Sequence, residues 1–280
     1  MTIRFDGQVA IVTGSGRGLG KAYVTLLAAR GASVIVHDAG VALDGTGSDP
    51  GVADAVVHEI TAAGGIAAPS YENIEAHEGC LRLIDTALSQ FGRLDILIHN
   101  AGWITFTSLE EMTPQLLERV LTIQVKAPFW LSQAAFSTMQ RQRYGRIIFT
   151  TSGRGMFLED ALPDLSGYAI GKMAQLGLMN ALAVAGQDHG IQVNAISPVA
   201  ATRMFFSPVA PGELRPEQVA PAVAFLASSQ CTFSGVILRA ANGRFATVRW
   251  QRTAGVDFAE ADISPEEIAQ QWSSIAGQLT

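Results

Sequence analysis

The chain has 280 residues, a hydrophobic fraction of 48% and a formal net charge of −6. This length and apolar content suit one large α/β domain, and the acidic balance argues against a nucleic-acid partner, which would leave a basic footprint. No apolar run reaches about 18 residues and the first residues lack the apolar core of a signal peptide, so we expect no membrane partner and a cytoplasmic location. The two cysteines, Cys80 and Cys231, are too few for a disulfide framework and are expected to be buried thiols.

The first elements expected are a strand, a glycine-rich turn and a helix. An apolar run from Val9 meets four glycines that end at Gly20, and residues 21–30 are compatible with a helix. Glycines let a backbone approach phosphates, and a helix start offers amide N–H groups and a positive dipole end. Leu19 breaks the strict G-x-G-x-x-G pattern, but T-G-x-x-x-G-x-G fits from Thr13. The turn is therefore expected to bind a dinucleotide through Gly14, Ser15, Arg17, Gly18, Leu19 and Gly20.

An acidic residue ends the second expected strand, over residues 32–38. Asp38 lies about 20 residues beyond the glycine turn, where a carboxylate can bond both ribose hydroxyls of the adenosine half. The same carboxylate repels a 2′-phosphate, and neither Ala39 nor Gly40 supplies a compensating base. Arg17 acts in the opposite direction, because it could reach a phosphate. The sequence therefore favours NAD over NADP as the cofactor.

The middle of the chain alternates helices and strands in the order of a parallel α/β sheet. A polar, glycine-rich segment over residues 40–51 is expected to be a mobile surface loop. Beyond it we expect a helix, a strand, a helix and a strand over residues 52–63, 65–70, 75–91 and 94–98. The last of these strands ends in a polar, flexible stretch where a ligand could approach, formed by Asn100, Ala101 and Gly102.

The second half continues this alternation. Thr113 opens a long helix that Pro128 should bend or interrupt, and Pro198 should break the strand over residues 191–196. Further strands are expected over 146–152 and 235–239, with helices from 166 and over 216–228. These elements predict one Rossmann-like, doubly wound parallel sheet of about seven strands with helices on both faces. Residues 1–280 are treated as a single domain, in which 242–280 form a C-terminal extension with an exposed strand over 244–250 and a last helix after Ser264.

Tyr168 and Lys172 stand four residues apart on an expected helix, so their side chains share one face. A phenol with a pKa of about 10 is a weak base at neutral pH, and a neighbouring ammonium favours the phenolate. Ser152 ends a strand and would present its hydroxyl at the rim where ligands bind in open parallel sheets. A Tyr/Lys pair is common by itself, but after a serine-ended strand and a dinucleotide turn it becomes specific.

With these motifs the chain resembles the short-chain dehydrogenase/reductase family over nearly its whole length. The resemblance rests on the cofactor turn, the Asn100–Gly102 stretch, Ser152, Tyr168 and Lys172, and Asn194 with Pro198. Within that family it is most similar to the (3R)-hydroxyacyl-CoA dehydrogenase unit of peroxisomal multifunctional enzymes, through residues 3–7, 144–148, 202–204 and 249–253. Related bacterial members include hydroxysteroid dehydrogenases.

The resemblance implies roles for these residues and an oligomeric state. Tyr168 would be the acid/base, Lys172 would lower its pKa and hold the nicotinamide ribose, and Ser152 would bond the substrate oxygen. Pro198 would lie near the nicotinamide. A homodimer or homotetramer is also implied.

Four features depart from the family pattern. His99 replaces an asparagine, and Val199 replaces a glycine. Gln124 aligns with the helix asparagine that completes a proton relay, and can still donate and accept. The loop over residues 153–167 is a few residues longer than usual and should reshape the substrate pocket.

The leading hypothesis is a NAD-dependent dehydrogenase acting on a secondary alcohol or ketone of an apolar small-molecule substrate, either a 3-hydroxyacyl thioester or a hydroxysteroid. The alternative is a non-catalytic NAD(P)-binding regulatory protein on the same fold. A nucleotide-sugar epimerase usually needs a larger second lobe than the short tail provides. No residue is assigned to a metal, and apolar pocket walls would come from Met156, Phe157, Met204, Phe205 and Phe206 if their loops face the site.

Overall fold

The structure, a computed structural model, describes residues 2–205, 207–259 and 262–277. The chain divides into two compact units, Met1–Thr247 and Val248–Thr280. The smaller unit holds helices α9 (Pro265–Gln270) and α10 (Trp272–Ala276), and α9 opens with the expected capping box between Ser264 and Glu267. The larger unit contains the sheet and all the residues discussed as site residues below.

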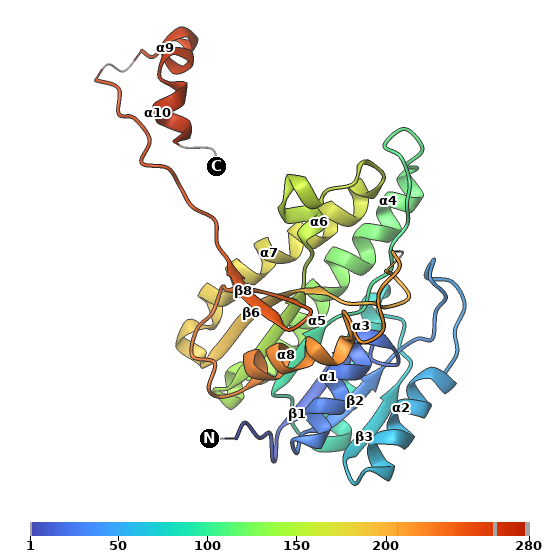
Figure 1. Cartoon of the computed structure of the whole chain (residues 1–280). Helices are drawn as coiled ribbons and strands as arrows, with labels where there is room; N and C mark the ends of the chain where they lie inside the picture. Colours follow the sequence, from blue (N-terminus) through green and yellow to red (C-terminus); the bar gives the residue numbers. More distant parts are fainter. Residues whose placement is uncertain (1, 206, 260–261, 278–280) are drawn as a thin grey trace. The chain divides into compact units, whose positions relative to one another are not determined.

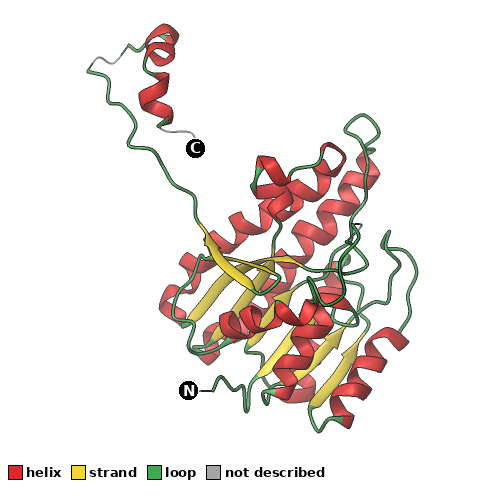
Figure 2. Cartoon of the chain, viewed as in Figure 1, coloured by secondary structure: helices red, strands yellow, loops and turns green. Residues whose placement is uncertain are grey.

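The larger unit is built on an eight-stranded sheet in the order β3-β2-β1-β4-β5-β6-β7-β8. Figure 2 shows its strands in yellow and the helices in red. All neighbouring pairs from β3 to β7 are parallel. The Rossmann-like, doubly wound sheet expected from the sequence is therefore confirmed, with eight strands rather than about seven. The strands are β1 (Val9–Thr13), β2 (Ser33–His37), β3 (Ile66–Ser70), β4 (Ile96–His99), β5 (Gly145–Thr150), β6 (Ile191–Val199), β7 (Ile237–Ala241) and β8 (Arg244–Val248).

The eighth strand follows from the turn that precedes it. Asn242 and Gly243 separate β7 from β8, and their φ angles are 47° and 79°. Positive φ at both residues of a two-residue connection is the signature of a type I′ hairpin, for which Asn-Gly is the strongest sequence signal. The chain therefore folds back on β7, and the alternating segment expected to be an exposed strand becomes the edge of the sheet.

Two groups of helices cover the sheet, as expected (Figure 1). Helix α1 packs against α2 and α8 on one face, while α5 packs against α3 and α7 on the other. The helices of the larger unit are α1 (Gly18–Ala29), α2 (Gly51–Ala62), α3 (His77–Phe91), α4 (Pro114–Leu121), α5 (Ala127–Gln142), α6 (Gly153–Met156), α7 (Ser166–Gly186) and α8 (Ala220–Ala227).

Pro128 changes the long helix in a specific way. Between α4 and α5 the chain forms one π-helical turn, η1 (Thr122–Lys126), and Pro128 stands in the first turn of α5. Proline has no N–H to donate to the carbonyl four residues earlier, which is that of Gln124. That carbonyl instead accepts a hydrogen bond from Gln175 Nε2 of α7 at 2.9 Å. The proline thus joins α5 to α7 at the residue expected to take part in catalysis.

Pro198 does not break β6, contrary to the sequence-based expectation. The strand continues to Val199 and pairs with β7, with Pro198 opposite Ala240. The Ile196 carbonyl accepts from Thr151 N, so the backbone groups of Ile196, and of Pro198 two residues later, face β5. Because β5 ends at Thr150, the N–H that proline lacks would have no partner strand there.

Both cysteines are buried free thiols, as the sequence suggests. Burial raises the pKa of Cys80 to about 12 and also raises the pKa of Cys231. Among the residues that the structure describes, no helix combines the length and apolarity needed to cross a bilayer.

Candidate active site

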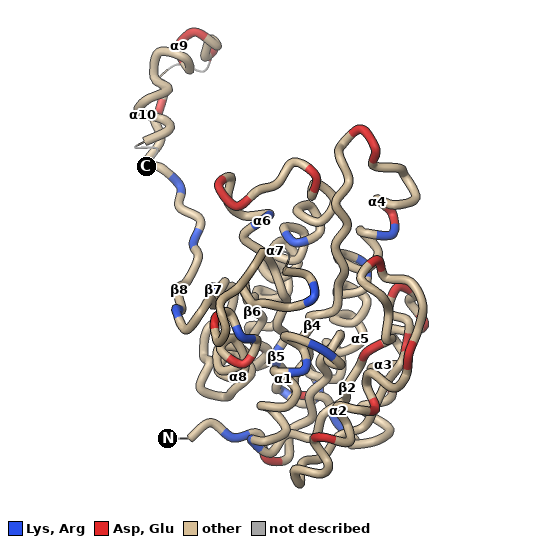
Figure 3. Tube along the Cα trace, turned by 45° about the vertical axis from the view of Figure 1, so that its right-hand side comes forward, with Lys and Arg blue, Asp and Glu red and all other residues tan. Residues whose placement is uncertain are grey.

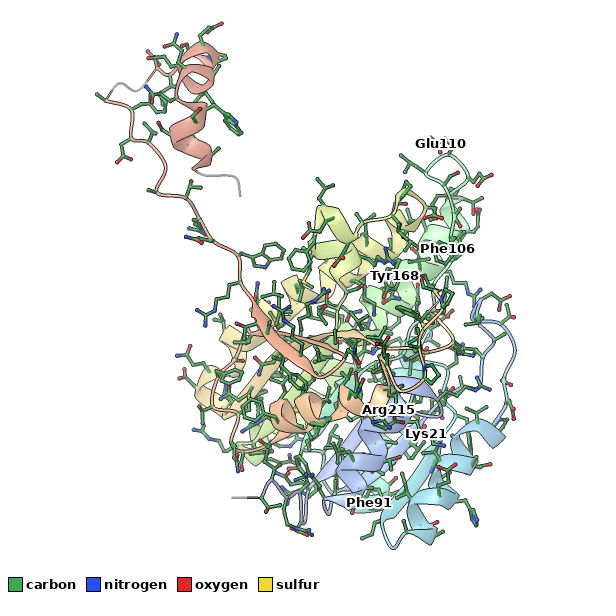
Figure 4. The ribbon with its side chains drawn as sticks, viewed as in Figure 1. Lys21, Phe91, Phe106, Glu110, Tyr168 and Arg215 are labelled. Carbon is green, nitrogen blue, oxygen red and sulfur yellow. The ribbon has the colours of Figure 1, made fainter. Side chains whose placement is uncertain are left out.

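A cleft of about 650 Å³ lies at the carboxyl ends of the strands, where the strand order reverses between β1 and β4. Open α/β sheets bind ligands at such a point, and the volume suits a small molecule. Figure 4 shows Tyr168 and Phe106 at this end of the sheet. Twelve predicted site residues line the cleft: Gly14, Arg17, Gly18, Leu19, Asp38, Asn100, Ala101, Gly102, Ser152, Tyr168, Lys172 and Pro198.

The glycine turn is packed closely against its neighbours, as Gly14 and Gly20 illustrate. Gly14 has a φ of +64°, and a Cβ there would lie 2.9 Å from the Cα of Ala101. A Cβ on Gly20 would overlap the Gly14 carbonyl oxygen. The turn therefore keeps its backbone exposed to the cleft, which is the arrangement a dinucleotide pyrophosphate requires. Gly20 supports this packing from behind rather than lining the cleft.

Asn100 and Thr13 hold the turn against the end of β4. The Asn100 side-chain Nδ2 donates to the carbonyls of Thr13 and Gly14, both at 3.1 Å. The buried Thr13 hydroxyl accepts from the backbone N–H groups of Asn100 and Ala101, at 3.1 and 3.0 Å. The polar stretch predicted from the sequence is thus an anchor for the turn as well as part of the cleft wall.

His99 completes this anchor in a neutral state. Its Nδ1 lies 3.3 Å from the Thr13 hydroxyl, and the side chain is fully buried. Burial, assisted by the charge of Lys172, lowers the pKa of His99 to about 3. The histidine that replaces the family asparagine is therefore uncharged at neutral pH and acts as a packed, hydrogen-bonding group.

Asp38 lies where the sequence predicts it, at the end of β2 and in the cleft. Its carboxylate accepts the N–H groups of Gly16 and Gly40, at 2.9 and 2.8 Å. Two arginines lie close by, because Arg17 and Arg203 both donate to the Val41 carbonyl, at 3.3 and 2.9 Å. One carboxylate and two guanidinium groups therefore lie near the end of β2, so that this part of the cleft carries both signs of charge.

Ser15 faces away from the cleft. Its side chain is fully buried and its hydroxyl donates to the His37 carbonyl at 3.4 Å. Its backbone N–H donates to the same carbonyl at 2.9 Å. Ser15 is among the residues predicted to bind the coenzyme. In the structure its hydroxyl and its backbone N–H join the glycine turn to β2.

Residues 39–49, here called the strap, are tied down on both sides of the cleft, although the sequence suggests a mobile loop. Arg119 of α4 donates to the carbonyl of Asp44 at 3.1 Å and to that of Gly45. The same guanidinium lies 4.8 Å from the centroid of the Trp103 ring and 3.5 Å from the Glu75 carboxylate. Together with the bonds to Val41, these contacts hold the strap beside the coenzyme turn.

Ser152, Tyr168 and Lys172 come together as the sequence predicts. The side chains of Ser152, Tyr168 and Lys172 all line the cleft, and Lys172 Nζ lies 5.6 Å from the centroid of the Tyr168 ring. Lys172 is 4% exposed, its Nζ donates to the Thr150 carbonyl at 2.8 Å, and burial lowers its pKa to about 7. A phenol, a hydroxyl and an amine therefore converge at the rim of β5.

One residue near the phenol was missed by the sequence reasoning. Burial raises the pKa of Tyr168 above its ordinary value, while the hydrogen bond from Ser152 and the charge of Arg154 act to lower it. Arg154 also lines the cleft. Its place two residues after Ser152 is visible in the sequence, but nothing in that spacing indicates that the guanidinium approaches Tyr168.

Gln124 lies next to α7 but outside the cleft lining. It is fully buried, and a Cβ on Gly171 would overlap its own Cβ. Its Nε2 donates to the Trp103 carbonyl at 3.2 Å, and its Oε1 accepts from Gln175 at 3.3 Å. Its side chain thus bonds to Trp103 and Gln175, and the expected relay role stays a prediction.

The other end of the cleft is apolar with a charged rim. Met204 and Phe205 line it as proposed, whereas Met156 and Phe157 are outside the lining and Phe206 is outside the described residues. Further apolar lining comes from Ile104, Phe106, Leu162 and Leu165, and charged lining from Arg154, Glu159, Asp160 and Arg239. Figure 3 shows acidic positions in the loops beside α6 and α4.

No group of three or more His, Cys, Asp or Glu side chains suited to a metal ion occurs within residues 2–205, 207–259 and 262–277.

Comparison with known proteins gives a consistent picture. The family model described as short chain dehydrogenase matches residues 8–206. Peroxisomal multifunctional enzyme A of Dictyostelium discoideum is 37% identical over 278 residues, which are 98% of this chain and 61% of that protein. The peroxisomal hydratase-dehydrogenase-epimerase of Neurospora crassa is also 37% identical over 278 residues, with 30% of that protein covered. The chain thus spans less than two thirds of the length of these relatives.

A solved structure of a short chain dehydrogenase from Mycobacterium avium superimposes with a TM-score of 0.84 at 32% identity, covering 97% of this chain and 95% of that one. The chain belongs to the short-chain dehydrogenase family. It is accordingly a dehydrogenase that acts on CH–OH groups with a nicotinamide dinucleotide as its cofactor.

Proposed function

We propose that this chain is a NAD-dependent dehydrogenase that interconverts a secondary alcohol and a ketone on an apolar substrate, with Tyr168 as the acid/base. The observation that carries the proposal is the pair of hydroxyl groups of Ser152 and Tyr168, which line the same cleft, with Lys172 Nζ 5.6 Å from the centroid of the Tyr168 ring. A general base must lie within hydrogen-bond reach of the proton that it removes, and this pair can bond one substrate oxygen from two sides.

The residues of the cleft suit the coenzyme. The glycine turn lines the cleft through Gly14 and Gly18, and a side chain at Gly14 or Gly20 would disturb the packing that holds the turn in place. When bound, the nicotinamide supplies the hydride acceptor for oxidation and the donor for reduction. Ser152 would hold the substrate oxygen, and Tyr168 would take its proton in oxidation and return it in reduction. Lys172, with a pKa lowered to about 7, would exchange protons near neutral pH and orient the ribose.

The preference for NAD rests on Asp38. A carboxylate held by Gly16 and Gly40 at the end of β2 would face the adenosine ribose and repel a 2′-phosphate. Arg17 and Arg203 lie near enough to weaken that repulsion. We therefore expect a higher kcat/KM with NAD than with NADP. Initial rates measured with each coenzyme check this, and turnover with NADP alone would contradict the role given to Asp38.

The substrate class rests on two different observations. The names of the relatives include multifunctional enzymes and a hydratase-dehydrogenase-epimerase, which supports a 3-hydroxyacyl thioester. The longer loop over residues 153–167 favours the other candidate, a hydroxysteroid. Absorbance of the reduced nicotinamide, followed with a panel of hydroxyacyl thioesters and hydroxysteroids, distinguishes the two classes.

Tyr168→Phe tests the enzyme function against the non-catalytic regulatory alternative. General acid–base catalysis contributes about 10²- to 10⁴-fold, so the variant should lose turnover by that factor and still bind NADH. An unchanged rate would remove the base from the mechanism and favour the regulatory protein. The homodimer or homotetramer and the cytoplasmic location also stay predictions, to be checked by light scattering and by cell fractionation.

A further inference from the structure

The end of β5 holds Lys172 at two points. Lys172 Nζ donates to the Thr150 carbonyl at 2.8 Å, and the backbone carbonyl of Lys172 accepts a hydrogen bond from the Thr151 hydroxyl at 2.9 Å. The side chains of Thr150, Thr151 and Lys172 are all buried. Because Ser152 is the next residue, the same short stretch carries the proposed substrate-binding hydroxyl and fixes the proposed catalytic lysine.

Thr151 is itself fixed to the sheet. Its N–H donates to the Ile196 carbonyl of β6 at 2.9 Å, beside the last register pair of β5 and β6. The branched Cβ of a threonine restricts its χ1 angle, so a fixed backbone also gives the hydroxyl a defined direction. The pairing of β5 with β6 therefore helps to set the position of the Lys172 backbone.

A second contact limits the movement of the same part of α7. A Cβ on Gly171, the residue before Lys172, would overlap the Cβ of Gln124, so the helix packs directly against η1 at this point. Gln175 Nε2 adds a hydrogen bond to the Gln124 carbonyl at 2.9 Å. The helical turn that carries Lys172 is therefore held between η1 and the end of β5.

The backbone of α7 does not need the Thr151 hydroxyl to be paired. The Lys172 carbonyl lies inside α7, where a helix carbonyl accepts the N–H of the residue four positions further on. A carbonyl oxygen has two lone pairs, so the bond from Thr151 is an additional one. Replacing the hydroxyl by a methyl group would leave this acceptor paired, and an unpaired buried group is the costly case. The fold should therefore tolerate the loss of this hydroxyl.

The position of Lys172 matters because the lysine acts on Tyr168 through distance. Nζ lies 5.6 Å from the centroid of the Tyr168 ring, and a cation favours a phenolate less as the separation grows. Among the residues that the structure describes, no carboxylate forms an ion pair with Lys172. Nζ is therefore kept in place by the Thr150 carbonyl and by the backbone position that Thr151 secures.

We propose that Thr151 is a positioning residue, whose hydroxyl holds the Lys172 backbone so that Nζ keeps its place beside the Tyr168 phenol. Thr151 acts through Lys172 and not through contact with the substrate. This inference rests on the proposed dehydrogenase function and adds a residue to the same site. The threonine is visible in the sequence, but its bond to a residue 21 positions away is not.

The test uses two variants of Thr151 and one control. Thr151→Val removes the hydroxyl and keeps the shape of the side chain, whereas Thr151→Ser keeps the hydroxyl. Thr86→Val is the matched control, because the Thr86 hydroxyl also donates to a helix carbonyl, that of Arg82 at 2.8 Å, and Thr86 is outside the cleft lining. The single-turnover rate of hydride transfer, KM and the NADH dissociation constant are measured with the best substrate among hydroxyacyl thioesters and hydroxysteroids.

We expect Thr151→Val to slow hydride transfer about three- to tenfold, the factor that one net hydrogen bond corresponds to, with KM and the NADH dissociation constant changed less than about twofold. Thr151→Ser should recover most of the rate, and Thr86→Val should not change it. A wild-type rate in Thr151→Val, or an equal loss in Thr86→Val, would overturn the role of Thr151. A loss of NADH affinity as large as the loss of rate would overturn it as well.

A second measurement does not depend on turnover. The chain has three lysines, Lys21, Lys126 and Lys172, so lysine labelled with carbon-13 at Cε gives three NMR signals that can be followed with pH. Lys21 and Lys126 are partly exposed members of ion pairs. Burial lowers the pKa of Lys172 to about 7, which identifies its signal.

Thr151→Val should raise the pKa of Lys172 by about half a unit, because a loosened Nζ is better hydrated and hydration favours the charged form. Two titratable groups lie beside Lys172, and neither interferes near pH 7. His99 at the end of β4 has a pKa of about 3, and burial raises the pKa of Tyr168 above its ordinary value. An unchanged pKa of Lys172 in Thr151→Val would overturn the inference.

The two measurements separate this inference from the proposed function. Turnover by the wild type, together with an unaffected Thr151→Val, would refute only the inference. A wild-type protein that binds NADH but turns over no hydroxyacyl thioester or hydroxysteroid would refute the dehydrogenase function. The NMR titration would then still decide whether Thr151 holds Lys172.

Discussion

The two sides of the cleft are held together in different ways. On the coenzyme side, buried or half-buried side chains bond directly to the backbone of the turn, as Asn100 does to the Thr13 and Gly14 carbonyls and Asp38 to the Gly16 N–H. Hydrogen bonds of this kind are costly to leave unmade when their groups are buried. The coenzyme side is therefore shaped before any ligand arrives.

On the substrate side, the loop after Ser152 consists of short turns: α6, η2 (Leu158–Asp160) and η3 (Pro163–Leu165). Its ties come from partly exposed groups, such as the Asp160–Arg239 pair with 37% and 35% side-chain exposure, and Leu158 is 92% exposed. Such contacts contribute little stability. We therefore expect substitutions on the coenzyme side to lower the stability of the fold. Substitutions on the substrate side should instead change substrate specificity.

The largest effect is expected for Gly20→Ala, which places a Cβ against the Gly14 carbonyl. Overpacking of this kind costs about 1–3 kcal/mol of unfolding free energy and should also weaken NADH binding. Gly177→Ala in α7 is the control, because a Cβ there meets nothing within 4 Å and should stabilise by about 0.5–1 kcal/mol. Urea unfolding measures both, and equal outcomes for the two variants would argue against a rigid coenzyme side.

His99→Asn should flatten the dependence of stability on pH. The folded pKa of His99 is about 3, below its ordinary value of 6.5, so only the unfolded chain takes up this proton as pH falls below 6.5. The contribution of His99 is therefore complete above that pH and is lost progressively toward pH 3, by about 2 kcal/mol between pH 7 and 5. His37 is also buried with a lowered pKa and contributes in both proteins. The unfolding free energy of wild type and variant is measured at pH 7 and at pH 5. An equal loss between these two pH values in both proteins would contradict the prediction.

Arg119→Leu removes the tie between α4 and the strap. Two bonds to carbonyls are lost, so NADH should dissociate about three- to tenfold faster in stopped-flow displacement. Arg82→Leu is the control, because it breaks an ion pair with Glu72 and Arg82 is not in the cleft lining. A dissociation rate that does not change would mean that the strap does not retain the coenzyme.

Asp160→Asn should have the smallest effect on folding and act mainly on substrate. The lost pair with Arg239 is partly exposed, so unfolding free energy should change by less than about 1 kcal/mol. We expect KM for the best substrate to rise a few fold with the NADH dissociation constant unchanged. A coenzyme affinity that falls as much as KM rises would remove the distinction between the two sides.

The sequence predicts the coenzyme side well for a physical reason. Strands β1 and β4 are buried on both faces, so Val9–Thr13 and Ile96–His99 read as almost continuous apolar runs. The groups at the ends of these strands and of the neighbouring β2 have fixed positions once the sheet forms, which is why Gly14, Asp38 and Asn100 all reach the cleft.

The rest depends on contacts between distant residues. Arg119 meets Gly45 across 74 positions, so no local pattern could show that the strap is tied down. The side chain of Gln124 is directed by a π-helical turn that its own sequence does not indicate. Arg154 gains its place from the packing of two glycines against other segments, which spacing alone cannot reveal.

The burial of Cys80 and Cys231 should leave both thiols of the folded protein almost unreactive toward alkylating agents. The thiolate is the reactive form, and a pKa of about 12 for Cys80 leaves almost none of it at neutral pH. Ser48, exposed on the strap, can therefore be replaced by cysteine and labelled with a fluorophore without first removing the native sulfurs. Emission from that single dye would report movement of the strap in real time.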